Sequence, residues 1–469
     1  MKRGNADILL PSALGALGCA ALVLWLTAGR FVSLQPRLPG GDGVPETTGS
    51  GDEAPPEPTG AVPLDGQPSA LPGSWPWFRG TAFDGIAREG VSLARQWPAG
   101  GPEILWNIEL GPGHAGAAVD RGRVFVLDYD PAVLADTMRC FSLDDGREIW
   151  RNSYPVEVVE NHGMSRTVPA VSGDCVVSFG PKCHVACWNV ETGDCLWLID
   201  LVQKYGAKVP NWYAGQCPII DADRVILAPC AKACLIAVDL ESGNVVWESE
   251  KVSNWEMTHV SILPMTFAGR KSYVYCGSGG VVGVDAEDGK ILWQTIDWVG
   301  NMATCPTPVD IHDGRIFFSS GYGAGAKMMR LNENAGSWSI ETLLETKPKQ
   351  FESEQHTPLF FDGHVYGVRT KSGGEQLVCM DLDGNEIWNS GRDKFGRGPY
   401  MIADGLLILL DDTGQLTIAE ATAEAYRPLA QAQVIDHAHD AWAPMALAGG
   451  RLILRDLTRM KCLNLAAGP

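Results

Sequence analysis

Basic residues are scarce in this chain of 469 residues. It has 37 Lys and Arg against 56 Asp and Glu, and a formal net charge of −19. A protein that neutralises phosphates needs clustered Lys and Arg, so the composition argues against a nucleic-acid partner. Local catalytic motifs are also missing: there is no Gly-x-Ser-x-Gly, no His-Glu-x-x-His and no phosphate-binding loop. We therefore assign no catalytic residue and no metal ligand from the sequence.

Glycine, proline and tryptophan, in contrast, are abundant. The chain has 54 Gly, 30 Pro and 16 Trp, which favours many turns over long helices. Apolar residues make up 45% of the chain and charged residues 20%, as in an ordinary folded protein. The thirteen cysteines are an odd number in a long chain, so a complete disulfide framework is not implied.

The N-terminus contains a run without charge, residues 8–29, which lies between Lys2-Arg3 and Arg30. About 20 apolar residues span a bilayer as a helix. We expect residues 1–30 to be an uncleaved signal anchor, a single transmembrane helix in a bacterial-type inner membrane. The basic end should then be cytoplasmic and the rest of the chain periplasmic. A signal peptide cleaved after Ala28 is the main alternative. A lipoprotein signal ending at Cys19 is less favoured, because the apolar run continues past it.

The next segment, residues 31–74, is rich in Pro, Gly and acidic residues and has almost no aliphatic pattern. Such a composition cannot bury enough apolar surface to offset its chain entropy. We expect a disordered linker between the membrane and a folded domain.

Tryptophans recur along the rest of the chain at intervals of 44 to 50 residues, at Trp106, Trp150, Trp197, Trp247, Trp293, Trp338 and Trp388. Most of them follow a short segment with a glycine four residues earlier, at Gly146, Gly193, Gly243 and Gly289. The pattern indicates a strand, a tight turn and a second strand. A period of 40–50 residues with several strands per unit predicts a β-propeller.

Prolines mark the same units a second time, at Pro169, Pro218, Pro264, Pro308, Pro358, Pro399 and Pro444. Proline suits an edge strand, and the innermost strand of a propeller blade is such an edge. We therefore expect an all-β fold, an eight-bladed propeller of four-stranded blades over residues 104–469. The strand at Trp106 should close the ring against the C-terminal strands. Seven blades remain possible, because the units near residues 332–338 and 417–426 are degraded.

The units resemble the pyrroloquinoline-quinone (PQQ)-type repeat, Ala-x-Asp-x-x-Thr-Gly-x-x-x-Trp, most closely at residues 187–197, 237–247 and 283–293. Similar propellers occur in quinoprotein dehydrogenases and in the outer-membrane β-barrel assembly lipoprotein B. The segment 75–103, which begins Trp75-Pro-Trp-Phe-Arg-Gly80, looks like the lead-in of a bacterial membrane-associated subgroup. The resemblance covers about residues 75–467 and is specific for the fold, whereas function depends on sites carried by the fold.

Two functions are compatible with this resemblance. The first is a non-catalytic scaffold that binds a protein partner or a ligand at the cell envelope, without a cofactor. The alternative is a PQQ-dependent dehydrogenase that oxidises an alcohol or a sugar, with PQQ and Ca²⁺ in the channel and with Asn301 and Asp440 as candidate Ca²⁺ ligands. Against the alternative, the chain has neither the adjacent Cys-Cys pair of the alcohol-oxidising families nor a Cys-x-x-Cys-His haem site.

Several cysteines have a structural explanation. Cys140, Cys187, Cys379 and Cys462 occupy the repeat position that holds Ala237 and Gly283 in other units, so they fill a slot for a small buried side chain. Cys183 and Cys234 fall near hairpin turns of neighbouring blades. A disulfide between them is a hypothesis, because spacing does not determine connectivity.

Polar and aromatic residues precede the proline strands and should meet on one axial face of the ring. Loops on a rigid scaffold commonly carry binding residues. Our candidates for ligand binding are His162, Trp212, His259, Asn301, His356, Arg397, His437, His439 and Asp440. Alternatively, these side chains merely hydrate the channel mouth and satisfy backbone groups of edge strands.

Overall fold

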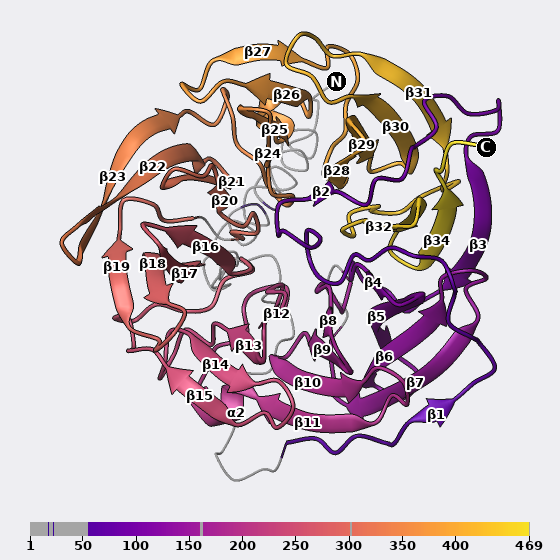
Figure 1. Cartoon of the computed structure of the whole chain (residues 1–469), viewed down its shortest axis with the longest axis horizontal. Coiled ribbons are helices and arrows are strands. Elements are labelled where there is room, and N and C mark those ends of the chain that lie inside the picture. Colours follow the sequence, from indigo (N-terminus) through magenta and orange to yellow (C-terminus); the bar gives the residue numbers. More distant parts are fainter. Residues whose placement is uncertain (1–16, 18–21, 23–54, 160–162, 301–302, 469) are drawn as a thin grey trace, which may run out of the picture. The chain divides into compact units, whose positions relative to one another are not determined.

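Eight sheets form a ring of blades, each built on four antiparallel strands, and two of the sheets have a fifth strand (Figure 1). The computed structural model describes residues 17, 22, 55–159, 163–300 and 303–468. The described residues from 55 onward belong to one compact unit. The innermost strands of successive blades contact one another around the central channel, as β4 does with β8 and β32. The predicted all-β eight-bladed propeller is confirmed.

The blades follow one another in chain order, and the strands of each blade are named from the channel outward. Blade 1 contains β4 (Ala118–Asp120), β5 (Arg123–Asp130), β6 (Ala135–Ser142) and β7 (Glu148–Pro155), and blade 2 contains β8 (Ala170–Ser172), β9 (Cys175–Phe179), β10 (His184–Asn189) and β11 (Cys195–Asp200). Blade 3 contains β12 (Ile219–Asp221), β13 (Arg224–Leu227), β14 (Ile236–Asp239) and β15 (Val245–Glu248), and blade 4 contains β16 (Leu263–Phe267), β17 (Arg270–Gly277), β18 (Gly280–Asp285) and β19 (Ile291–Thr295). Blade 5 contains β20 (Val309–Asp310), β21 (Arg315–Ser320), β22 (Gly325–Asn334) and β23 (Ser337–Thr346), and blade 6 contains β24 (Leu359–Phe361), β25 (His364–Val368), β26 (Leu377–Met380) and β27 (Glu386–Asn389). Blade 7 contains β28 (Tyr400–Ala403), β29 (Leu406–Leu410), β30 (Gln415–Glu420) and β31 (Pro428–Gln433), and blade 8 contains β32 (Ala446–Ala448), β33 (Arg451–Arg455), β34 (Arg459–Asn464) and β3 (Glu103–Glu109).

Blade 8 closes the ring with strands from both ends of the propeller sequence. Its outer strand β3 pairs antiparallel with the C-terminal β34, and Trp106 lies opposite Cys462. The N- and C-terminal parts of the propeller are therefore held together by a ladder of backbone hydrogen bonds, as the sequence predicted. Closure also removes two long open sheet edges.

The repeated tryptophans hold neighbouring blades together. The indole Nε1 of Trp150 donates to the carbonyl oxygen of Val190 in blade 2 at 2.9 Å, and Trp197 donates in the same way to Leu240 in blade 3. Each indole covers the glycine turn of the next blade: Gly146, Gly193, Gly243 and Gly289 have φ of 69–77°, and a Cβ on any of them would lie 2.5–2.8 Å from the indole. These glycines are thus required both for the turn conformation and for the close approach.

The small-residue slot lies opposite each tryptophan in the same blade. Cys140 pairs with Trp150, Cys187 with Trp197 and Cys379 with Trp388, and all three cysteines are fully buried. At the equivalent Gly283, an added Cβ would lie 2.2 Å from the Trp293 indole. The indole crosses over the slot, so only a small side chain fits beneath it.

Blade 5 departs from the predicted spacing. The residue in its tryptophan position is Leu344, which pairs with Met328 at the bulge and packs on Gly384 of blade 6. Trp338 lies six residues earlier on β23, near the hairpin tip, with its ring 5.9 Å from that of Phe267. The inclusion of Trp338 in the repeat was therefore wrong, because the blade 5 hairpin is longer than the others and shifts the bulge away from it.

Part of the predicted disordered linker is paired with blade 1. Thr59 and Leu64 donate backbone hydrogen bonds to Ser153 and Ile149, and β1 (Val62–Pro63) adds a fifth strand outside β7. The physical reason is that the outer strand of a blade is an edge with unpaired backbone groups. Proline-rich chain loses little entropy when it adds to such an edge. The remainder of the linker, residues 31–54, lies outside the described residues.

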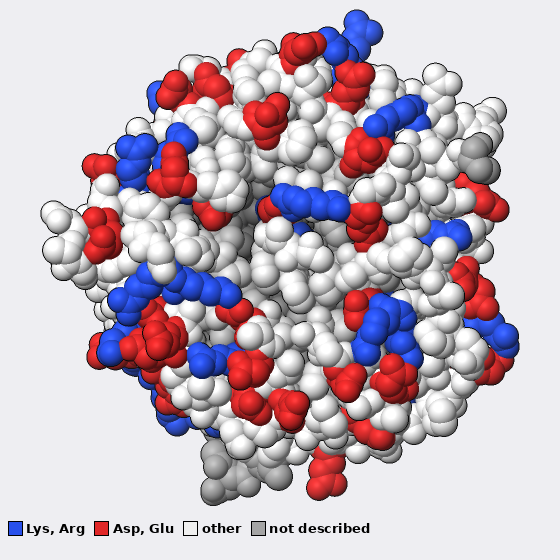
Figure 2. Space-filling view, in the orientation of Figure 1, with Lys and Arg blue, Asp and Glu red and all other residues white. Residues whose placement is uncertain are grey.

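The lead-in segment crosses the central channel, as the indigo chain shows in the middle of the ring (Figure 1). Trp75 pairs with Val119 of blade 1, and the carbonyl oxygen of Pro76 accepts from Val171 of blade 2. The segment then reaches blade 7, where β2 (Ile86–Ala87) pairs parallel with β28. On the face in this view, acidic and basic side chains are intermixed around the rim (Figure 2).

The predicted transmembrane helix, residues 8–29, lies outside the described residues except for Leu17 and Leu22. Within the part of the chain that the structure describes, no helix is long and apolar enough to cross a membrane.

The predicted Cys183–Cys234 disulfide is not present, since both thiols are free. The Sγ atom of Cys183 lies 4.0 Å from the Sδ atom of Met257. Cys234 instead interacts with Cys230, at the other end of its own loop. The prediction was wrong because the two thiols that the sequence paired have different neighbours in the core.

Candidate binding site at the axial face

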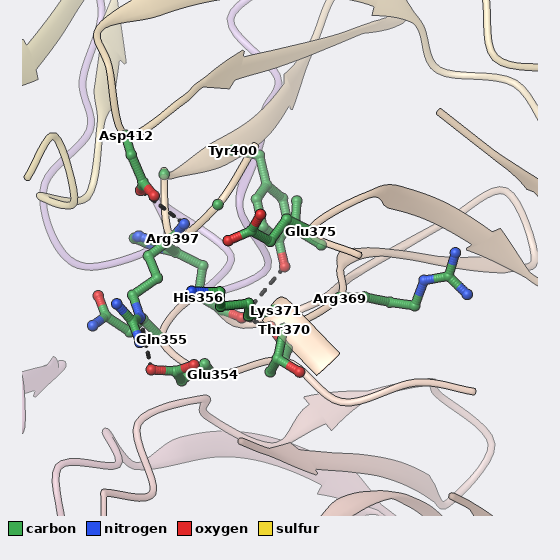
Figure 3. Close-up of a pocket in the computed structure, with 14 residues that line it drawn as sticks. Glu354, Gln355, His356, Arg369, Thr370, Lys371, Glu375, Arg397, Tyr400 and Asp412 are labelled. Carbon is green, nitrogen blue, oxygen red and sulfur yellow. Dashed lines mark hydrogen bonds and ion pairs between the residues drawn. The ribbon is translucent and has the colours of Figure 1, made fainter. Parts of the chain in front are cut away.

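The connections that lead into the inner strands converge at one end of the channel. Arg397 precedes blade 7, and its Nε donates to the Oε1 of Glu354, which precedes blade 6, at 2.7 Å (Figure 3). Its guanidinium carbon lies 5.3 Å from the ring centroid of Trp442, which precedes blade 8. Trp442 in turn stacks on His114, before blade 1, at 5.2 Å. Four successive connections are thus linked side chain to side chain.

Asp412 holds this cluster in place from a second kind of loop, the β29–β30 hairpin. Its Oδ1 accepts from the backbone N–H of Arg397 at 2.8 Å and from the indole Nε1 of Trp442 at 2.8 Å. The carboxylate therefore fixes the orientation of both the arginine loop and the indole.

A cavity of about 160 Å³ lies beside Arg397. Its lining is Ser353, Glu354, Gln355, His356, Val368, Arg369, Thr370, Lys371, Glu375, Gly396, Arg397, Gly398, Tyr400 and Asp412 (Figure 3). Burial lowers the pKa of His356 to about 4 and raises that of Tyr400 to about 12, so both side chains are neutral at pH 7. The charged side chains of the cavity wall are therefore Glu354, Arg369, Lys371, Glu375, Arg397 and Asp412.

The lead-in segment lies next to this cavity, through Arg79. The guanidinium of Arg79 donates to the carbonyl oxygens of Thr357 and Pro358 at 3.2 and 3.3 Å. Its charge also acts on the neighbouring His356 and Tyr400. Arg79 thus holds the lead-in segment against the connection before blade 6, which supplies part of the cavity wall.

A second group of predicted residues lies around Arg166, in the connection before blade 2. Arg166 Nε donates to the carbonyl oxygen of Trp212, whose ring centroid is 6.4 Å from that of His259. Burial, and next the charge of Arg166, lower the pKa of His259 to about 3. Trp212 and Tyr213 have φ of 61° and 70°, which is unusual for large side chains and marks a functional position or local strain.

The remaining predicted residues are less closely associated. The Nδ1 of His439 lies 3.3 Å from the Oδ2 of Asp440, and both His437 and His439 are exposed. The carbonyl oxygen of His437 accepts from Arg459 at 3.2 Å. His162 and Asn301 lie outside the described residues.

Sequence reasoning missed Glu354, Trp442, Arg166 and Asp412. The first two lie two residues from predicted positions, His356 and Asp440, so a wider window before each proline strand would have included them. Arg166 lies three residues before Pro169, so the same wider window would have included it. Nothing in the repeat pattern indicates Asp412, because it belongs to a loop between the second and third strands.

The dehydrogenase alternative requires a Ca²⁺ site in the channel. Among the described residues, no group of three or more His, Cys, Asp or Glu side chains could hold a metal ion. Of the two candidate ligands, Asp440 pairs with His439 and Asn301 lies outside the described residues. Asp412 is already engaged by two nitrogen donors.

Comparisons with known proteins agree with the fold. The structure is similar to BamB from Moraxella catarrhalis, with 14% identity over 77% of this chain and 99% of that one and a TM-score of 0.50. The computationally designed Ika8 protein gives 10% identity over 77% and 99% and a TM-score of 0.52. The quinohemoprotein alcohol dehydrogenase from Comamonas testosteroni gives 12% identity over 84% and 81%, with a TM-score of only 0.44. At these identities the likeness concerns the fold alone.

No curated protein matches the sequence. Residues 134–373, just over half of the chain, match the family described as outer membrane protein assembly factor BamB. The PQQ-like repeats and the eight-bladed ring agree with that match. The chain therefore belongs to this family.

Proposed function

We propose that this protein is a non-catalytic binding scaffold outside the cytoplasm, anchored by residues 8–29 in the inner membrane, with the axial face as its docking surface. One observation carries the proposal: Arg397, Trp442 and Glu354 are held together at the open end of the channel by contacts of 2.7 to 5.3 Å. Arginine and tryptophan are enriched in the energetically important centres of protein interfaces. Groups that are already ordered lose less entropy on binding.

The kind of partner follows from the shape and charge of this face. A broad ring of loops suits another folded protein or an exposed peptide strand better than a small molecule. The cavity of about 160 Å³ beside Arg397 is smaller than the 300–1,000 Å³ typical of small-molecule sites. The family match supports a partner at the cell envelope.

Site-specific photo-crosslinking in the full-length, membrane-associated protein tests the docking surface. A photoreactive residue at the exposed His439 should capture a discrete envelope protein. The same residue at Asp223, whose side chain is 82% exposed in the β12–β13 turn at the opposite ends of the inner strands, should not. Equal capture at both positions, or at neither, would contradict the proposal.

Two further measurements separate the remaining parts of the proposal. Carbonate extraction should leave the full-length chain in the membrane fraction, and its release would contradict the anchor alone. Titration with PQQ and Ca²⁺ should leave no bound quinone spectrum and no dye reduction with alcohols or sugars. Tight quinone binding would favour the dehydrogenase alternative.

A further inference from the structure

The loop between β13 and β14 carries two cysteines, Cys230 and Cys234, that the docking cluster does not use. Both thiols are free in this structure. The backbone N–H of Lys232, between them, donates to the carbonyl oxygen of Tyr205 at 3.2 Å. At the start of the loop, the N–H of Ala228 donates to the Oε1 of Gln216 at 2.8 Å. Tyr205 and Gln216 belong to the connection that leads into blade 3, so this loop lies on the axial face.

The loop backbone brings the two cysteines together. The N–H of Cys230 donates to the carbonyl oxygen of Cys234 at 3.1 Å, and the N–H of Ala231 donates to that of Ala233 at 2.9 Å. The two residues share only this one bond, because the N–H of Cys234 donates to the carbonyl oxygen of Glu250 at 3.4 Å. With standard bond lengths, a single N–H···O=C bond of 3.1 Å keeps the two Cα atoms within about 7 Å of each other. A disulfide requires a Cα separation of about 4.4–6.8 Å.

The side chains converge as well. Cys230 and Cys234 are 4% and 1% exposed and belong to the same apolar cluster as Tyr275 of β17. The phenol of Tyr275 interacts with both thiols. A hydrogen bond with Cys230, followed by burial, raises the pKa of the Cys234 thiol. The Sγ atom of Cys230 faces β17, because a Cβ added at Gly277 would lie 3.2 Å from it, and the Cys234 thiol interacts with that sulfur.

We propose that Cys230 and Cys234 form an intramolecular disulfide that locks this loop of the axial face. The proposal rests on the proposed location outside the cytoplasm, where disulfides form and persist. Each thiol loses its proton, and formation of the S–S bond releases two electrons. A disulfide oxidant such as oxidised glutathione accepts them and becomes two thiols. The bond joins residues four positions apart, so it restrains the loop without altering the ring.

Trypsin provides a direct assay, because Lys232 lies between the two cysteines. Cleavage after Arg224, Lys232 and Lys251 yields peptides 225–232 and 233–251, each with one cysteine. We expect that folded full-length protein, equilibrated with oxidised glutathione and alkylated, yields these peptides joined, with a mass two hydrogens below their sum. Dithiothreitol before alkylation should separate them completely.

The pair Cys140 and Cys276 is the control within the chain. Both residues are buried, Cys140 on β6 of blade 1 and Cys276 on β17 of blade 4, so their sulfur atoms cannot meet in the folded ring. We expect no link between peptide 140–147, which carries Cys140, and peptide 272–290, which carries Cys276. Equal formation of both links would indicate scrambling in unfolded chain and would overturn the proposal.

A stability measurement keeps the proposal testable if oxidation in solution is slow. Oxidised wild-type protein should have a higher Tm than the same sample in dithiothreitol, and C230A/C234A should show no such difference. Free thiols at both positions after prolonged oxidation, with no effect of dithiothreitol on Tm, would leave the cysteines as packing residues and overturn the proposal. A bond that forms in glutathione buffer but is absent from protein isolated from cells would contradict the proposed location instead.

Discussion

The Nε of Arg397 donates to the Oε1 of Glu354 at 2.7 Å across the boundary between blades 6 and 7. The two residues lie 43 positions apart in the sequence, close to one repeat unit. The same guanidinium covers the Trp442 ring of the next connection. Because the units repeat around the ring, residues at similar positions of successive units lie next to each other. They form one continuous cluster of charged and aromatic side chains at the channel mouth.

The first prediction concerns binding at this cluster. We expect R397A to weaken capture of the envelope partner by about tenfold or more, because truncated arginine hot spots typically cost at least about 2 kcal/mol. The control R427A removes the same charge from an exposed pair with Glu420 and Glu424, and it should change binding by less than about twofold. Quantitative crosslinking from His439 measures both variants. If the two variants weakened binding equally, the loss of binding would come from the change in net charge and not from the cluster.

A second prediction concerns the tryptophans between blades. W150A should lower the free energy of unfolding by about 3–5 kcal/mol, because Trp150 is 1% exposed and its removal leaves a large cavity. W338A should cost only about 1 kcal/mol, since this half-buried residue lies outside the repeat position. Denaturant unfolding of the two variants side by side provides the comparison. A similar cost for both would refute the assignment of Leu344 as the repeat residue of blade 5.

The slot beneath the tryptophan gives a third prediction. In G283A the new methyl group would meet the Trp293 indole at 2.2 Å, so we expect a loss of about 1–3 kcal/mol from overpacking. Gly100 has open space around its Cβ position, and G100A should leave the midpoint of thermal unfolding nearly unchanged. If G283A proves neutral, the indole does not cross the slot in solution.

The fourth prediction is a pH dependence of stability that arises from Asp136. Burial raises the pKa of this carboxyl to about 7 from the ordinary 3.8, although its Oδ2 accepts from the Tyr154 hydroxyl at 2.8 Å. The folded protein therefore binds this proton more tightly than the unfolded chain. The resulting stability is complete below about pH 4 and is lost as pH rises through about 7.

Replacing this carboxyl by an amide should remove the penalty. We expect the Tm of D136N to exceed that of wild-type protein by several °C at pH 8 and the difference to shrink toward pH 4. D223N, in an exposed turn, should follow the wild-type profile. Thermal unfolding from pH 4 to 8 measures the curves, and a D136N advantage independent of pH would rule out titration of Asp136 as its source.

The sequence predicted the architecture because its determinants are local. A turn that needs positive φ, such as that at Gly193, and a slot that needs a small side chain, such as Cys187, recur within eleven residues of each tryptophan. They can therefore be recognised in the chain. Trp338 shows the limit of this reasoning: its spacing fits the repeat, but the length of the β22–β23 hairpin places Leu344 in the repeat position instead.

The candidate site was accessible to sequence reasoning only in part. Its position followed from the proline strands, since every connection before an inner strand reaches the same end of the channel. Asp412 was not accessible, because its hydrogen bonds to Arg397 and Trp442 depend on how a hairpin of blade 7 meets two neighbouring connections. The disulfide hypothesis was wrong for a similar reason: side-chain direction in the core selects the partner of Cys234.

The sequence by itself thus determined the propeller fold, its four-stranded blades and the closure of the ring, because short-range periodicity encodes strands, turns and packing positions. The structure decided for eight blades rather than seven. Only the tertiary structure decided which segments lie against the ring and which side chains meet at its axial face. It placed the lead-in segment across the channel, paired the proline-rich segment with blade 1 and joined Glu354, Arg397 and Trp442 into one surface. These contacts link residues far apart in the chain, and their geometry depends on the relative positions of whole blades, which no local pattern specifies.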